Sequence, residues 1–352
     1  MAIVTIVGAG MMGSALSWPL CDNGHTVRLV GTPLDEEIVA SIQSQHLHPK
    51  LQRLMPEGVS AFRWTELAAA LQGADVVASG VSSFGVEWFA KTAGPLLHPE
   101  VPVIAVTKGL EDEPDGTLVI LPEVTRRLLP PGLREQVSLN AIGGPCTSHE
   151  LAARRQTGVV FCGDDLGVLG RLKGIFATNY YHIWPSTDVT GVEICAAMKN
   201  AYALAVGIGL GMMEKDGPDG VAEAYNPQAA LFAQGCTEMR KMLALLGGGT
   251  DNATWLPGPG DLYVTIFGGW TVKLGRLIGH GHTFAEARAL LAGVTLESVE
   301  ITTRVARALP GLAARGLARL EDFPLILHID QIINHGAPVN IPWDKFFSSF
   351  PA

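Results

Sequence analysis

The sequence has few charged residues and no cluster of basic ones. Of its 352 residues 17% are charged, and 34 acidic residues against 25 Lys and Arg leave a net charge of −9 at pH 7. Nucleic-acid binding requires a basic patch, so we expect no nucleic-acid partner. Aromatic residues are also few, at 7%, but 47% of the residues are hydrophobic, which excludes a disordered chain and allows a substantial core.

The sequence also lacks a cysteine pattern, a leader segment and a long apolar run. The five cysteines are scattered and form no C-x-x-C pair, which is typical of a protein in a reducing compartment. Met1 leads directly into an apolar segment, which leaves no room for a signal or transit peptide. No uninterrupted apolar stretch reaches the length that spans a bilayer. We therefore predict a cytoplasmic protein without a membrane partner.

The histidines indicate no metal site. His46 and His48 lie two residues apart, as do His280 and His282, and both pairs fall in expected loops without a nearby set of Cys, Asp or Glu ligands. Solvated or hydrogen-bonded histidines are more common in such a setting than metal ligands. We therefore expect no bound metal.

A glycine motif close to the N-terminus indicates a dinucleotide site. The apolar run 3–7 is followed by Gly8-Ala9-Gly10-Met11-Met12-Gly13, then by an expected helix from Ser14 to about Asn23 and a second strand at 27–30. This strand, turn, helix and strand arrangement is the context in which G-x-G-x-x-G binds a pyrophosphate. The N–H groups at the helix start, at Met11 and Met12, would face that anion.

Each glycine of the motif has its own expected role. Gly8 would allow the tight turn, and Gly10 would let the backbone approach the pyrophosphate. Gly13 would let the helix pack closely on the strand. A glycine-rich turn in another α/β fold is the alternative interpretation.

The remainder of the first half alternates between strands and helices. Further strands are expected at 59–62, 74–81, 101–106, 137–142 and 158–162. Strands joined by helices predict a doubly wound, mostly parallel sheet of the Rossmann type. Ligands of such a sheet lie at the carboxyl ends of the strands, where Lys108 and Gly144-Pro145 fall.

The second half is mostly helical. Long helical segments are expected at 192–211, 228–246, 284–291 and 297–309. We therefore predict an α/β protein with an N-terminal Rossmann domain at 1–186 and a C-terminal all-helical domain at 187–352. The first would bind the dinucleotide, and the second would carry the substrate and catalytic groups.

Two polar residues stand out in the second half. Lys199 lies among small residues in the middle of an Ala-rich helix, where its ammonium either reaches the surface or is buried for a purpose. Asp261 follows a Gly- and Pro-rich loop, where it either caps the next segment or orients a catalytic group. The residues alone leave both choices open.

Several short motifs, taken in order, resemble the NAD(P)-dependent glycerol-3-phosphate dehydrogenase family, and the resemblance covers nearly the whole chain. They are Gly8 to Gly13, Thr107-Lys108-Gly109-Leu110-Glu111, Gly144-Pro145, Asp188 to Glu193, Lys199-Asn200, Asn226 to Leu231 and Gly260 to Thr265. Single motifs of this kind arise by chance, but the ordered set is specific.

The resemblance implies a role for each matching residue. Lys199 matches the catalytic lysine that accepts the proton of the reacting hydroxyl, and Lys108 matches a lysine that binds and polarises the substrate. Asn200, Asp261 and Thr265 match the polar groups around them. Oxidation of a secondary alcohol needs a base on the hydroxyl and a hydride acceptor, so these roles agree with the chemistry.

The sequence departs from the family in three places. Trp270 and Thr271 stand where the family has an Arg-Asn pair that binds the substrate phosphate, and Lys273 or Arg276 would have to compensate. The family's cofactor glutamate matches Glu300, but Ile301 replaces the glycine that usually follows it. Gly31-Thr32 replace the acidic residue expected after the second strand, so the cofactor could be NAD or NADP.

We therefore expect an NAD(P)-dependent dehydrogenase that interconverts a secondary alcohol and a ketone on a small polyol-type substrate. Glycerol 3-phosphate and dihydroxyacetone phosphate form the leading pair. One alternative is a paralogue acting on an unphosphorylated polyol or a sugar acid, with Trp270, Thr271 and Lys273 shaping the substrate site. Another is a nicotinamide sensor without catalysis. We also expect a homodimer.

Overall fold

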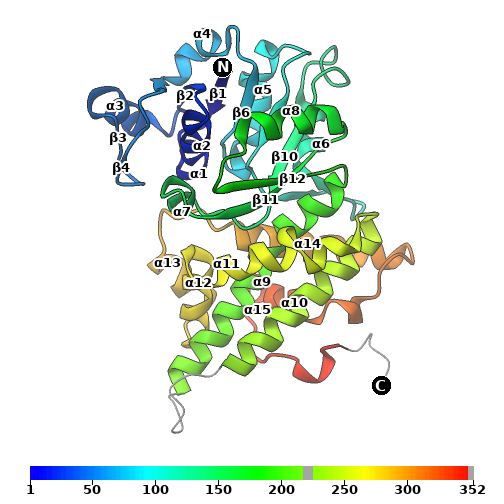
Figure 1. Cartoon of the computed structure of the whole chain (residues 1–352). Coiled ribbons are helices and arrows are strands. Elements are labelled where there is room, and N and C mark those ends of the chain that lie inside the picture. Colours follow the sequence, from blue (N-terminus) through cyan, green and yellow to red (C-terminus); the bar gives the residue numbers. More distant parts are fainter. Residues whose placement is uncertain (217–224, 348–352) are drawn as a thin grey trace. The chain divides into compact units, whose positions relative to one another are not determined.

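The computed structural model describes residues 1–216 and 225–347 and divides into two compact units (Figure 1). Unit 1 consists of Met1–Lys108 and Leu121–Val189, and unit 2 of Gly109–Ile120 and the chain from Thr190 onward. The predicted domains, 1–186 and 187–352, placed residues 109–120 in the first domain. That segment belongs to the compact body of unit 2 instead.

Unit 1 is built on an eight-stranded sheet. Across the sheet the strands are ordered β12 (Tyr181–Ser186), β11 (Thr157–Cys162), β10 (Leu139–Gly143), β7 (Val103–Ala105), β6 (Val76–Ser79), β1 (Ile3–Val7), β2 (Thr26–Val30) and β5 (Val59–Phe62). The central β1 pairs in parallel with both neighbours, so that Val4 lies opposite Val27 and Val76. Only β10 and β11 pair antiparallel among the described strands of this sheet. The predicted doubly wound, mostly parallel sheet is confirmed.

Helices cover both faces of this sheet. They are α1 (Met11–Ala15), α2 (Ser17–Asp22), α3 (Glu36–Gln45), α4 (Leu67–Leu71), α5 (Val86–Thr92), α6 (Leu121–Leu128), α7 (Ser148–Ala152) and α8 (Leu166–Phe176). Val4 and Ile6 of β1 pack into a core that includes α2, α3 and α8, whereas Val7 packs into a second core with α4 and α5. The central strands β1 and β6 are mostly apolar because both of their faces are buried, whereas the edge strand β12 alternates buried and exposed residues.

Within the described residues, unit 2 is helical apart from one hairpin. Its helices are α9 (Val189–Asp216), α10 (Tyr225–Leu246), α11 (Asp261–Ile266), α12 (Gly269–Gly279), α13 (Phe284–Leu290), α14 (Glu297–Ala314) and α15 (Pro324–His335). Val189–Lys215, which Lys199 interrupts, is long and apolar enough to cross a membrane by length and composition, and its most apolar window is 94% buried. Such burial is typical of the central helix of a helical core.

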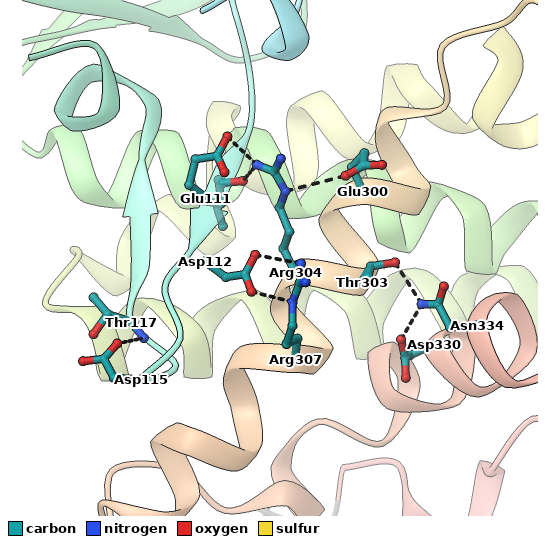
Figure 2. Close-up of polar contacts among 11 residues, drawn as sticks. Glu111, Asp112, Asp115, Thr117, Glu300, Thr303, Arg304, Arg307, Asp330 and Asn334 are labelled. Atoms are coloured by element: carbon teal, nitrogen blue, oxygen red, sulfur yellow. Dashed lines mark hydrogen bonds and ion pairs between the residues drawn. The ribbon is translucent and has the colours of Figure 1, made fainter. Parts of the chain in front are cut away.

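The hairpin of β8 (Leu110–Asp112) and β9 (Leu118–Ile120) was missed by the sequence analysis. It packs on α14 through ion pairs of Arg304 with Glu111, at 2.8 Å, and of Arg307 with Asp112 (Figure 2). The backbones also approach closely, since a Cβ added to Gly116 would lie 2.7 Å from the Ala308 carbonyl oxygen. These contacts fix the chain directly after Lys108.

Glycines bring α9 and α12 into backbone contact. A Cβ on Gly211 of α9 would lie 2.2 Å from the Arg276 carbonyl oxygen, and one on Gly279 of α12 would lie 2.2 Å from the Ile208 carbonyl oxygen. Gly207 and Gly275 make equivalent approaches. Because only glycine fits at these positions, the two helices are held at a fixed distance. This also fixes the relative positions of the side chains that α9 and α12 carry.

A buried carboxylate holds the start of α15. Glu238 of α10 is fully buried and accepts hydrogen bonds from the N–H groups of Leu325 and Ile326, from Gln234 and from the Tyr202 hydroxyl. The carboxylate thereby provides acceptors for the N–H groups of Leu325 and Ile326, which lie in the first turn of α15 and have no partner within the helix. Burial raises the pKa of Glu238 to about 7, although the four donors act in the opposite direction.

We expect Glu238→Gln to flatten the dependence of stability on pH. Because the folded-state pKa of about 7 lies above the ordinary 4.5, the favourable contribution of Glu238 is fully present below pH 4.5 and is lost as the pH rises to about 7. The difference amounts to about 3 kcal/mol. Urea denaturation of both proteins at pH 5 and pH 8 would measure it. Identical pH dependence in wild type and variant would contradict the prediction.

Candidate active site

Lys199 is the centre of a buried polar cluster in unit 2. It lies on α9 and is 8% exposed, and its Nζ donates to Asp261 Oδ1 at 2.7 Å and to Thr265 Oγ1 at 2.8 Å. The Thr265 hydroxyl in turn donates to the Asp261 carbonyl oxygen at 2.6 Å. Of the two alternatives left open by the sequence, the structure shows the buried lysine.

The loop before α11 places Asp261 against this lysine. Residues Leu256–Gly260 form a wide π-helical turn, and a Cβ on Gly258 would lie 2.6 Å from the Asn252 carbonyl oxygen. Asp261 then begins α11 and is 1% exposed, and Thr265 follows one helical turn later on the same face. The carboxylate therefore binds the Lys199 ammonium, and the role of Asp261 in orienting a catalytic group stays a prediction.

The other predicted substrate residues divide into two groups within unit 2. Asn200 is 7% exposed and follows Lys199 on α9. Trp270, Thr271 and Lys273 lie in the first turns of α12, where Trp270 is 50% exposed and Lys273 Nζ lies 5.1 Å from its ring centroid. Arg276 forms an ion pair with Glu214 instead, so Lys273 is the better candidate to replace the missing arginine.

Lys108 follows β7 in unit 1. Its Nζ donates to the Gly144 carbonyl oxygen at 3.3 Å, and Gly144 follows the neighbouring strand β10. Both lie at the carboxyl end of the sheet, as predicted. Because Lys199 belongs to unit 2, the meeting of the two lysines at one substrate stays a prediction.

The glycine turn between β1 and α1 fits a dinucleotide. Gly8 has a φ of +114°, and a Cβ there would lie 2.6 Å from Gly80, while one on Gly13 would lie 2.4 Å from the Gly8 carbonyl oxygen. A Cβ on Gly10 would meet nothing nearer than 3.9 Å. Gly8 and Gly13 are thus required by internal packing, whereas the space beside Gly10 is open, and the binding of a pyrophosphate there stays a prediction. Met11 and Met12 head α1 beside Gly10.

We expect Gly10→Ala to weaken dinucleotide binding about tenfold or more and to leave the fold intact, because the methyl group enters the open space. Gly13→Ala should instead destabilise unit 1, since its Cβ meets backbone. Isothermal titration with the reduced dinucleotide and thermal denaturation would separate the two effects. Gly170→Ala, on a helix where a Cβ meets nothing within 4 Å, is the matched control. A Gly10→Ala protein with wild-type affinity would contradict this role.

Glu300 lies on α14 and forms an ion pair with Arg304 at 3.7 Å, the same arginine that binds Glu111 (Figure 2). The following Ile301 is 3% exposed and packs into the core of unit 2. A glycine is therefore not needed here for the helix to pack. The assignment of Glu300 to the cofactor stays a prediction.

Two residues of unit 1 that contact the glycine turn were not recognised from the sequence. Asp35 accepts from the N–H of Ala9, and His48 binds the carbonyl oxygen of Ala9. The only available signal was the position of Asp35, a few residues beyond β2. In residues 1–216 and 225–347 no group of three or more His, Cys, Asp or Glu could hold a metal ion.

Comparison with known proteins decides the family. The models for the N-terminal and C-terminal parts of NAD-dependent glycerol-3-phosphate dehydrogenase match residues 3–167 and 188–343. The chain belongs to this family. It is 37% identical over 285 residues to the NADP(+)-dependent glycerol-3-phosphate dehydrogenase of Archaeoglobus fulgidus, which covers 81% of this chain and 82% of the relative.

Two further relatives extend over almost the whole chain. A glycerol-3-phosphate dehydrogenase [NAD(P)+] of Lactobacillus delbrueckii is 29% identical, and the matched region covers 96% of this chain and 94% of that relative. The crystal structure of glycerol-3-phosphate dehydrogenase from Coxiella burnetii has a TM-score of 0.78 and 26% identity and covers 96% of each chain. The chain is thus an NAD(P)-dependent oxidoreductase acting on CH–OH groups, and the sensor alternative is not supported.

Proposed function

We propose that this enzyme interconverts glycerol 3-phosphate and dihydroxyacetone phosphate with NAD or NADP as cofactor. The observation that carries the proposal is the buried triad of Lys199, Asp261 and Thr265 in a chain of this family. Relatives of this chain, including the Archaeoglobus fulgidus protein, are described as glycerol-3-phosphate dehydrogenases. They favour a phosphorylated substrate over the plain polyol or sugar acid.

Lys199 is proposed to hold the proton that the reaction moves. A nicotinamide dinucleotide held at the turn of Gly8, Gly10 and Gly13 would supply or accept the hydride at the substrate carbon. In ketone reduction the Lys199 ammonium donates a proton to the carbonyl oxygen, and in alcohol oxidation the same nitrogen takes it back. Asp261 and Thr265 fix the direction of Nζ, and a positive group at this position also stabilises negative charge that develops on the oxygen.

The two units have separate proposed tasks. In unit 1 the turn at Gly8, Gly10 and Gly13 binds the pyrophosphate, and Lys108, at the carboxyl end of the sheet, contributes a cation to the substrate. In unit 2 Asn200 lies beside Lys199 and completes the polar surroundings of the reacting group. The proposed dinucleotide domain is therefore 1–186 without the segment 109–120, and the proposed substrate domain is 187–352 together with that segment.

The substrate phosphate is proposed to bind at the start of α12. The first N–H groups of this helix have no partner within the helix, and its dipole favours an anion. A Cβ on Gly268 or Gly269 would meet nothing within 4 Å, so the backbone there is open. Thr271 adds a hydroxyl, and Lys273 supplies the charge that the family takes from arginine.

A substrate panel tests the proposed function. Reduction of dihydroxyacetone phosphate, dihydroxyacetone and related ketones would be followed by the absorbance of NADH and NADPH. The proposal expects turnover of the phosphorylated ketone with a kcat/KM at least about a hundredfold above that of the plain one, since phosphate contacts contribute about 3 kcal/mol. Equal rates, or turnover of only unphosphorylated ketones, would overturn it.

We expect Trp270→Arg to lower the KM for dihydroxyacetone phosphate about tenfold, because it adds a guanidinium that can bind phosphate through two hydrogen bonds. Lys273→Met should raise the same KM by a similar factor. The exposed Lys173 of α8 offers a matched control, and Lys173→Met should change neither constant. If neither α12 variant alters KM, the phosphate binds elsewhere.

A cytoplasmic homodimer completes the proposal. The five cysteines, which all lie in the described part of the chain, form no disulfide, and Cys162 and Cys195 are buried, which suits a reducing compartment. Unit 2 exposes large aromatic side chains, among them Phe267 at 71%. Light scattering should therefore give twice the chain mass of 37.3 kDa, and a value equal to that mass would contradict the dimer.

A further inference from the structure

Ala9 lies between the first two glycines of the turn. Both its backbone N–H and its carbonyl oxygen form hydrogen bonds with side chains. The N–H of Ala9 donates to Asp35 Oδ2 at 3.2 Å. Its carbonyl oxygen lies 3.1 Å from His48 Nε2 and also accepts from the Ser14 hydroxyl at 3.2 Å. Ala9 itself is fully buried. Asp35 precedes α3 and His48 ends β3 (Leu47–His48), so one segment of unit 1 supplies both contacts.

The hydrogen bonds of His48 determine its tautomer. The N–H of Leu51 donates to Nδ1 at 3.1 Å, so Nδ1 carries no hydrogen. Nε2 therefore carries it and donates to the Ala9 carbonyl oxygen. His48 is fully buried, and burial lowers its pKa, so the ring is neutral at pH 7 with both nitrogens engaged.

Asp35 is directed toward the turn and away from its own helix. It stands at the N-cap of α3, where an aspartate ordinarily accepts from the first turn, but its carboxylate makes no such bond within the described part of the chain. Its Oδ2 instead accepts from the N–H and hydroxyl of Thr32, at 2.9 and 2.8 Å, and from Ala9. Directly after β2, where other dinucleotide folds carry the acidic residue that contacts a ribose, this chain has Gly31 and Thr32, and Asp35 further along contacts the turn.

We propose that His48 and Asp35 are positioning residues for the dinucleotide, which hold the Ala9 peptide groups so that the backbone at Gly10 faces the pyrophosphate. The inference rests on the proposed function, because it requires a nicotinamide dinucleotide at this turn. A turn with three glycines has a large conformational entropy when free. Contacts that hold the turn in place before the ligand binds reduce the conformational entropy that is lost on binding, and so strengthen binding.

Two conservative substitutions of His48 separate its two hydrogen bonds. In His48→Gln the side-chain amide reaches the position of Nε2 and can still donate to Ala9, but the acceptor for Leu51 is lost. In His48→Asn the side-chain oxygen takes the position of Nδ1 and can accept from Leu51, but the donor to Ala9 is lost. His46→Asn is the matched control, because His46 is exposed with a φ of +53° that Asn tolerates.

The readouts are the Kd for NADH and NADPH by isothermal titration, the melting temperature, and kcat and substrate KM at saturating cofactor. We expect His48→Asn and Asp35→Ala, each of which removes a side-chain contact with Ala9, to raise the Kd about tenfold, with kcat and substrate KM unchanged. His48→Gln and His46→Asn should stay within about twofold of wild type. A tenfold change equals about 1.4 kcal/mol, which is typical of one lost buried hydrogen bond.

Two results would overturn the inference. If His48→Asn binds as wild type does, the contact with Ala9 does not position the turn. If both His48 variants lower the melting temperature and raise the Kd to the same extent, the residue has a structural role only. A wild-type protein that binds neither dinucleotide would instead overturn the proposed function, and with it the inference, so the two failures are distinguishable.

Discussion

Replacing Lys199 by methionine is expected to lower kcat by about a thousandfold or more and to leave the Kd for NAD(P)H within about twofold of wild type. The loss follows because no other group then holds the proton for the substrate oxygen, and general acid–base catalysis contributes about 10²- to 10⁴-fold. The dinucleotide turn belongs to unit 1 and does not depend on this side chain. Steady-state rates and isothermal titration would measure both constants.

The variant Lys199→Arg distinguishes two roles of Lys199, the transfer of a proton and the supply of a positive charge. Arginine keeps the positive charge beside Asp261 but remains protonated at any working pH, so it should be nearly as inactive as methionine. Lys215→Met, at an exposed position on the same helix, should keep wild-type rates. An active Lys199→Met protein would remove the proposed chemistry altogether.

Removing Asp261 is expected to cause the largest loss of stability of any single substitution in the site. Asp261→Asn leaves the Lys199 ammonium 8% exposed without its counter-ion, and breaking such a buried pair costs about 3–5 kcal/mol of unfolding free energy. The double variant Lys199→Met with Asp261→Asn should be more stable than the sum of the single losses predicts, because no unpaired charge remains. Its turnover should stay at the level of Lys199→Met.

Urea denaturation of the four proteins gives the coupling energy of the pair. A coupling of about 2 kcal/mol or more would agree with a buried ion pair, whereas losses that add to within about 0.5 kcal/mol would contradict it. A second cycle, with Lys241→Met and Asp322→Asn, tests the alternative that any ion pair of unit 2 gives this result. That lysine pairs with Asp322 at 2.7 Å, and Asp322 is more exposed than Asp261, so we expect a smaller coupling there.

The sheet of unit 1 could be predicted because local sequence patterns determine it. Apolar runs such as 3–7 and 76–79 are buried on both faces, and they alternate with helical segments in the order that a doubly wound sheet requires. The hairpin 110–120 was missed for a physical reason. Its Glu- and Asp-rich sequence has the pattern of a loop, and it is held by Arg304 and Arg307, almost two hundred residues away in the chain.

The candidate site was predicted in part. The sequence indicated Lys199 and Asp261 separately, but it could not distinguish a buried lysine from an exposed one, or an orienting carboxylate from a cap. The structure brings the two to 2.7 Å across 62 positions of sequence. His48 and Asp35 gave no clear signal, because their common contact is with the backbone of Ala9 and not with any residue type that a motif could mark.

The order of glycines, strands and helices by itself determined the fold class of this protein, since steric limits and apolar periodicity act over a few residues at a time. The ordered set of short motifs indicated the family, and the comparison with known proteins confirmed it. The tertiary structure alone decided which polar groups are buried together: Asp261 with Lys199, Glu238 with the start of α15, and Asp35 with His48 around Ala9. The reason is that burial and pairing of charges depend on contacts between distant segments, and these exist only after the chain has packed.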